Sequence, residues 1–153
     1  MLEIRELRSG YGKTEVLQGI GLTIFPGQIT VICGPNGCGK STLLKAIAGI
    51  HPAKSGRVLL DGLDLRGLEP RKLARQVAYL PQSRQIPEIT ARHLVLHGRF
   101  PYLSYPRRYR KEDMKIAEQA METMGIPDLA DRYLSTLSGG QRQKVYIDRK
   151  SVV

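Results

Sequence analysis

The chain has 153 residues, about the size of one domain, and 41% of them are hydrophobic and 25% charged. That composition excludes a wholly disordered chain, and no run of 18 apolar residues is present to cross a membrane. The N-terminus is too charged for a secretory signal, and two cysteines are too few for a disulfide scaffold. We therefore expect a cytosolic protein in which Cys33 and Cys38 are reduced.

The formal net charge of +10 is unevenly distributed along the chain. Residues 1–53 carry five basic and three acidic groups, residues 54–111 thirteen and four, and residues 112–153 six and seven. Within 99–111 the basic residues are interleaved with Phe and Tyr, a combination that can bind single-stranded nucleic acid by charge and stacking. Two prolines in this stretch favour an irregular surface segment instead, so nucleic acid is the less favoured partner.

Hydrophobic periodicity and turn residues predict the secondary structure. In chain order we expect strands at 2–8, 17–24 and 28–33, a glycine-rich loop at 34–39, a helix at 41–50, a strand at 57–60, a short helix at 70–74, a strand at 77–80, and helices at 90–97, 112–124 and from 139 onward. The apolar, β-branched run at 28–33 is typical of a strand buried on both faces. Alternating strands and helices predict an α/β fold with a parallel sheet, preceded by a small antiparallel layer.

A phosphate-binding motif lies between one of these strands and the helix that follows it. The residues Gly34, Pro35, Asn36, Gly37, Cys38, Gly39, Lys40 and Ser41 match G-x-x-x-x-G-K-[ST] without a mismatch. Glycines let backbone N–H groups turn toward an anion, and the helix start adds N–H groups and the positive end of a dipole. Lys40 can reach the β- and γ-phosphates of a nucleotide, and the Ser41 hydroxyl can ligate Mg²⁺. The motif predicts nucleotide binding.

A second motif begins 96 residues after Ser41 and opens the last predicted helix. It consists of Leu137, Ser138, Gly139, Gly140 and Gln141, which we call the signature motif. Its serine and glycines expose backbone N–H groups at a helix start, which suits a second phosphate contact. At this spacing the two motifs together resemble the nucleotide-binding subunits of ABC transporters, over residues 1 to about 147.

The resemblance implies a fold and its subdivisions. The expected fold is α/β, with a P-loop NTPase (RecA-like) core, an N-terminal antiparallel β layer and a helical subdomain, incomplete at the C-terminus. Residues 1–82 would form the β layer and the core, 83–135 the helical subdomain, and 136–147 the signature helix. The basic stretch 84–111 would lie beside a groove that receives a helix of the membrane subunit.

The resemblance also implies ATP and Mg²⁺ as cofactors and assigns roles to single residues. Tyr11 would stack on adenine, and Gly34–Thr42 would contact the nucleotide together with the signature motif. Lys40 and Gln82 would act in catalysis, and Ser41 and Gln82 would hold Mg²⁺. In the family two subunits face head to tail, so that ATP lies between the phosphate loop of one and the signature motif of the other.

Residues 97–101, His-Gly-Arg-Phe-Pro, resemble the importers of iron chelates, haem and cobalamin. The resemblance thus implies an ATP-binding importer subunit that works with a transmembrane permease on the inner face of the cell membrane, in the cytoplasm. The alternative is an ABC-type ATPase outside transport, acting in DNA repair or translation. Co-purification with a membrane subunit rather than nucleic acid would separate the two.

The family pattern stops after Ile147. An apolar strand ending in Asp-Glu and a later His are expected there, and neither follows in this sequence. The Asp would hold Mg²⁺ and the Glu the attacking water, so we expect ATP binding without efficient hydrolysis. Residues 148–153 can be encoded by the start of a common sequencing adapter and are predicted to be a non-native tail. A natural frameshift or a degenerate gene copy is the alternative.

Overall fold

Two compact units, residues 1–79 and residues 80–153, make up the chain in this computed structural model. The structure describes residues 1–82 and 86–151, with the side chains of 1–82 and 86–147. Each unit has a hydrophobic core of its own. None of the helices in the described part of the chain is both long and apolar enough to cross a membrane.

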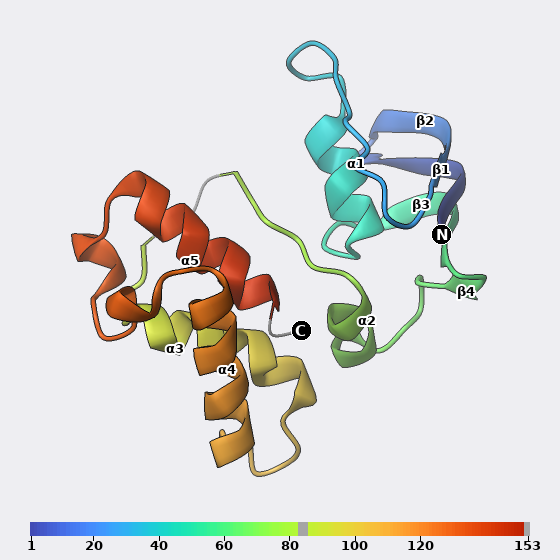
Figure 1. Ribbon diagram of the computed structural model, residues 1–153. Helices are drawn as coiled ribbons and strands as arrows, with labels where there is room; N and C mark the ends of the chain where they lie inside the picture. The colour runs from blue at the N-terminus through green and yellow to red at the C-terminus, as the bar shows by residue number, and fades with distance from the viewer. Residues whose placement is uncertain (83–85, 152–153) are drawn as a thin grey trace. The chain divides into compact units, whose positions relative to one another are not determined.

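The first unit is an antiparallel sheet with a helix packed on it (Figure 1). The strands lie in the order β2-β1-β3-β4. The elements are β1 (Leu2–Tyr11), β2 (Thr14–Ile24), α1 (Lys40–Ile47), β3 (Ala53–Leu60), β4 (Leu63–Asp64) and α2 (Pro70–Gln76). The predicted antiparallel layer and the two predicted helices of this part of the chain are confirmed.

One face of this sheet is apolar and lies against α1. Ile4 and Leu7 of β1 are both buried although they are three residues apart, because the pairing register shifts between them and Glu6 adopts a positive φ of 47°. Leu43 and Ile47 of α1 pack into the same cluster at helical spacing. The core therefore fixes the start of α1, where the phosphate-binding motif lies, against the edge of the β layer.

The predicted strands at 28–33 and 77–80 are wrong, and the described residues contain no parallel strand pair. Ile29 is 96% exposed and Val31 74% exposed. A strand buried on both faces needs hydrogen-bonded neighbours on both sides. None of the described strands pairs with this segment, so its apolar pattern does not produce a strand.

The second unit is helical (Figure 1). Its elements are α3 (Ala91–Leu96), the 3₁₀ segment η1 (His97–Tyr102), α4 (Lys111–Thr123), η2 (Pro127–Leu129), η3 (Leu134–Thr136) and α5 (Gly139–Ser151). Its core combines Val95 of α3, Met121 of α4 and Val145 of α5, all almost fully buried. The predicted helices are confirmed, and the buried Met121 is core filler as its position on the apolar face of α4 indicates.

Asp113 holds the start of α4. Its carboxylate accepts a hydrogen bond from the backbone N–H of Arg110 at 2.9 Å and from Nε of Arg99 at 3.0 Å. Burial raises the pKa of Asp113, but these hydrogen bonds and the two positive charges outweigh it and hold the pKa below its ordinary value. The pair links the 3₁₀ segment η1 to α4.

Candidate nucleotide-binding site

The phosphate loop lies at the solvent-exposed end of α1. Residues 34–38 are exposed, and α1 begins at Lys40 after Gly39, whose φ is 97°. A Cβ atom on Gly39 would lie 3.0 Å from Cγ1 of Val16 and 3.1 Å from Cδ2 of Leu17. Its left-handed backbone favours glycine here, and a Cβ would also press on two side chains of β2. The loop is accessible to a ligand, and its junction with α1 at Gly39 is packed against β2.

Lys40 folds back over the loop that precedes it. Its Nζ donates to the carbonyl oxygens of Gly34 at 2.8 Å and Pro35 at 2.7 Å, and lies 3.6 Å from Sγ of Cys38. A positive charge is thus held within the turn of the loop without a carboxylate partner among these contacts. A phosphate would offer it stronger, charge-assisted hydrogen bonds than the neutral carbonyls do.

The loop suits a phosphate chain and its metal ion. Leu43 is the first residue of α1 whose N–H reaches a backbone acceptor, the carbonyl of Gly39 at 2.8 Å. The N–H groups of the three preceding residues have no partner within the helix, as at every helix start, and are available to an anion. The Ser41 side chain is exposed beside them. These groups fit the predicted binding of the nucleotide's phosphates, with Ser41 as a ligand of Mg²⁺.

Tyr11 lies at the end of β1, where the β1–β2 hairpin turns. Its side chain is 51% exposed, and its ring stacks on that of His51 with a centroid separation of 4.4 Å and an interplanar angle of 33°. Tyr11 is predicted from the sequence as an adenine platform, whereas His51 is not. No local signal marks His51, since it is brought to Tyr11 only by the pairing of β1 with β3.

The signature motif opens α5 with a reciprocal pair of hydrogen bonds. The Ser138 hydroxyl accepts from the backbone N–H of Gln141 at 3.3 Å, and the Gln141 side-chain oxygen accepts from the backbone N–H of Ser138 at 3.0 Å. This is a capping box, which satisfies two N–H groups at the helix start. Gly139 and Gly140 are exposed, and a Cβ at either meets nothing within 4 Å. The open space leaves their backbone accessible to a ligand.

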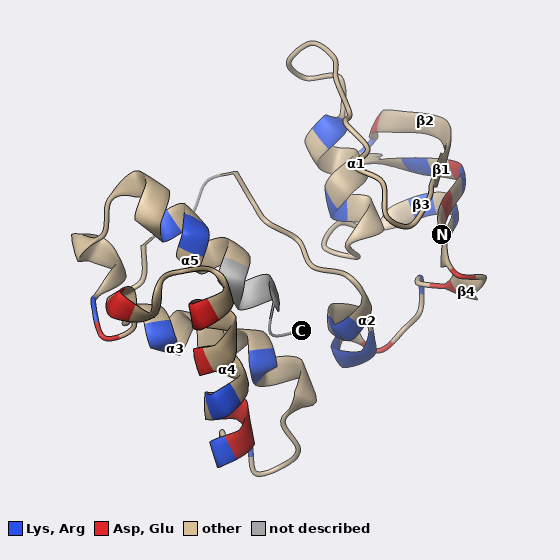
Figure 2. Cartoon of the chain, viewed as in Figure 1, with Lys and Arg blue, Asp and Glu red and all other residues tan. Residues whose placement is uncertain are grey.

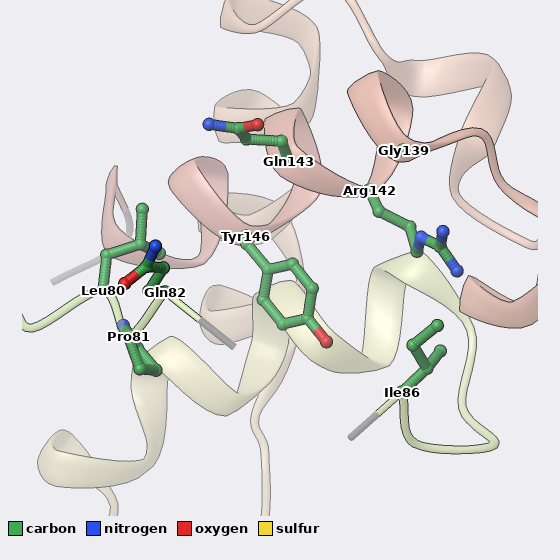
Figure 3. A pocket seen from close by; sticks show the side chains of 8 residues that line it. All are labelled: Leu80, Pro81, Gln82, Ile86, Gly139, Arg142, Gln143 and Tyr146. Atoms are coloured by element: carbon green, nitrogen blue, oxygen red, sulfur yellow. The ribbon is translucent and has the colours of Figure 1, made fainter. Parts of the chain in front are cut away.

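Gln82 lines a cavity of about 460 Å³ in the second unit (Figure 3). The same cavity is lined by Gly139 of the signature motif and by Arg142, Gln143 and Tyr146 farther along α5. Figure 3 shows the side chains of Arg142, Gln143 and Tyr146 extending from α5. Gln82 thus lines the same cavity as Gly139 of the signature motif, on the side away from it in Figure 3, while Tyr11 and the phosphate loop belong to the first unit.

Carboxylates do not converge in the described part of the chain. No group of three or more His, Cys, Asp or Glu side chains there is arranged to hold a metal ion. Cys33 and Cys38 are free and exposed.

The basic, aromatic segment 99–111 surrounds a second cavity of about 320 Å³ in the helical unit. Within this segment the guanidinium of Arg99 lies 4.3 Å from the centroid of the Tyr102 ring, and that of Arg107 lies 4.8 Å from the centroid of the Phe100 ring. Figure 2 shows basic residues at both ends of this segment and along α2. Two of the aromatic faces that would stack on bases are thus covered by the segment's own arginines.

A profile of the ABC transporter family matches residues 17–153 of the chain. The chain belongs to that family. Its most similar relatives include the probable siderophore transport system ATP-binding protein YusV of Bacillus subtilis, 42% identical over 92% of this chain and 52% of the relative. The ferric enterobactin transport ATP-binding protein FepC of Escherichia coli is 41% identical over 93% of this chain and 53% of its own length.

Solved structures of ABC proteins have the same fold. A nucleotide-free ATP-binding cassette from an ABC transporter superimposes with a TM-score of 0.88 at 29% identity, over 99% of this chain and 64% of the other. An ATP-binding cassette in its ADP conformation gives 0.86 at the same identity and coverage. The α/β ABC fold class is confirmed, and this chain spans about half the length of its curated ABC relatives.

Proposed function

We propose that this chain is the nucleotide-binding portion of the ATP-binding subunit of an ABC importer. The parent subunit would couple ATP binding and hydrolysis to uptake of an iron chelate, haem or a cobalamin-like ligand. The observation that carries the proposal is the exposed phosphate loop with the Lys40 ammonium held at its centre. The names of the relatives, which are siderophore and enterobactin transport proteins, support the substrate class.

In this proposal each site residue has a distinct part. Lys40 moves from the Gly34 and Pro35 carbonyls to the β- and γ-phosphates, where its charge is better matched. Tyr11 stacks on adenine, and Ser41 and Gln82 are the side chains that would hold Mg²⁺. When bound with the nucleotide, Mg²⁺ neutralises charge on the phosphate oxygens. The residues between Gly34 and Thr42 supply backbone N–H groups to the phosphate chain.

Two partners follow from the same proposal. A second ATP-binding subunit would face the first head to tail, so that Ser138, Gly139, Gly140 and Gln141 contact the nucleotide held by the other phosphate loop. A transmembrane permease would bind the helical unit, which places the subunit in the cytoplasm on the inner face of the membrane. The arginine-covered rings of segment 99–111 argue against nucleic acid as the partner.

We expect the chain to bind Mg·ATP but to hydrolyse it poorly. The sequence contains no Asp-Glu pair after an apolar run, and a site built from positioning and charge alone binds nucleotide without activating water. The test is ATP affinity and turnover of the 153-residue chain beside Lys40→Ala. Binding that requires Lys40, without turnover, supports the proposal. Absence of ATP binding would overturn it, and Lys40-dependent turnover would overturn the expectation on hydrolysis.

A further inference from the structure

Residues 51–54, which follow α1, are hydrogen-bonded to the β1–β2 hairpin near Tyr11. The Ser9 hydroxyl donates to the carbonyl oxygen of Pro52 at 2.9 Å, and Nζ of Lys54 donates to that of Gly12 at 3.2 Å. Between them, Nε2 of His51 lies 2.9 Å from the carbonyl oxygen of Gly10. A carbonyl only accepts, so this contact requires the proton on Nε2 and fixes the plane of the imidazole ring.

The fixed imidazole lies against one face of Tyr11. The ring centroids are 4.4 Å apart and the planes are tilted by 33°, a close aromatic contact at the short limit of favourable aromatic pairs. His51 is half-buried, whereas 51% of the Tyr11 surface remains exposed. His51 thus packs on one face of the Tyr11 ring, and the other face is available to a ligand.

We infer that His51 is a positioning residue for nucleotide binding, which holds the Tyr11 ring in the orientation that stacks on adenine. The inference rests on the proposed function and adds a residue that acts through Tyr11 on binding of the base rather than of the phosphates. A tyrosine at a hairpin turn otherwise loses side-chain freedom when a base stacks on it, and that loss weakens binding. The His51 stack, together with its hydrogen bond to Gly10, orders the ring before the base arrives.

The experiment compares the affinities of Mg²⁺ complexes of ATP and of inorganic tripolyphosphate, measured by calorimetry on the full chain. Tripolyphosphate has no base, so the ratio of the two affinities reports adenine recognition, and its own affinity reports an intact phosphate loop. We expect His51→Ala to reduce the ratio about 2- to 10-fold, the contribution of one aromatic pair, with tripolyphosphate affinity unchanged. His93→Ala is the matched control, because this exposed histidine belongs to α3 in the other unit.

Two further variants separate the ring from the hydrogen bond. His51→Phe keeps an aromatic ring behind Tyr11 and loses the bond to Gly10, and we expect it to retain most of the adenine preference. His51→Asn keeps an N–H donor and loses the ring, and we expect it to behave like His51→Ala. The reverse order, or an unchanged ratio in all three variants, would overturn the inference and leave the proposed function standing. A wild-type chain that binds neither probe would refute both.

Discussion

The ammonium of Lys40 lies 2.7 Å from the carbonyl oxygen of Pro35, five residues earlier in the chain. With the bond to Gly34 it spans the loop from the first residue of α1 back to the loop's beginning. The lysine thus helps to shape the same turn that would receive phosphate. Neutral carbonyls are weak partners for an ammonium compared with phosphate oxygens, so the contact is readily exchanged on binding.

Lys40→Ala is therefore expected to weaken Mg·ATP binding by about 10- to 100-fold, the effect of losing a hydrogen bond between charged groups. Lys45→Ala is the matched control, since Lys45 lies in the last turn of the same helix, and it is expected to stay within 2-fold of wild type. Titration of both variants with a fluorescent ATP analogue measures the difference. Equal affinities for the two variants would contradict the role of Lys40.

Gly39→Ala is expected to damage the loop more than Gly37→Ala. Both glycines have a positive φ, 97° and 83°, so alanine is strained at either position by about 1–2 kcal/mol. A Cβ at Gly37 meets nothing within 4 Å, whereas at Gly39 it would press on Val16 and Leu17. Urea unfolding followed by circular dichroism, with ATP affinity as a second readout, compares them. Equal losses would show that backbone conformation alone requires glycine at 39.

The sequence predicted the elements whose cause is local. Leu2 and Ile4, alternating with charged residues, mark a half-buried strand, Ser138 marks a helix start, and the glycines before Lys40 mark a phosphate loop, each through a short-range pattern. The run 28–33 has an equally clear pattern, yet Ile29 and its neighbours are exposed. Whether an apolar run becomes a strand depends on partners that the run does not encode. The pairing of β1 with β3, which brings His51 to Tyr11, likewise joins segments that are distant in the sequence and is not encoded locally.

Asp113→Asn is expected to destabilise the helical unit at neutral pH by about 1–3 kcal/mol. The carboxylate is 9% exposed and the Arg99 side chain 16% exposed, so the substitution leaves a poorly solvated guanidinium with a weaker partner. Asp131→Asn is the matched control, because Asp131 is 84% exposed in its ion pair with Arg92 and such pairs contribute less than about 1 kcal/mol. Urea unfolding at pH 7 measures both, and a loss in Asp131→Asn as large as in Asp113→Asn would contradict the assignment.

The Asp113 contribution also has a defined pH dependence. Because the pKa of Asp113 is lower in the folded than in the unfolded chain, ionisation favours folding. The stabilisation is fully present above the unfolded pKa of about 3.9 and disappears as the pH falls through the folded value. The stability difference between wild type and Asp113→Asn is thus expected to be constant near neutrality and to shrink below about pH 4. A difference that grew on acidification would contradict the sign.

Ser138 caps α5 and, in the proposed function, also faces the phosphates of a nucleotide held by a second subunit. Ser138→Ala removes the acceptor of the Gln141 N–H and is expected to cost about 1 kcal/mol of folding free energy. Ser138→Asp restores an acceptor at the cap and is expected to be as stable as wild type.

The aspartate variant nevertheless places a negative charge where the proposed head-to-tail dimer would place the phosphates of ATP. We therefore expect Ser138→Asp to abolish ATP-dependent self-association, measured by sedimentation velocity, while its ATP affinity as a monomer stays unchanged. Ser135→Ala, in the preceding 3₁₀ segment, is the control and should change neither property. If Ser138→Asp associated as well as wild type in the presence of ATP, the signature motif would not contact the nucleotide of a second subunit, because like charges at that contact repel.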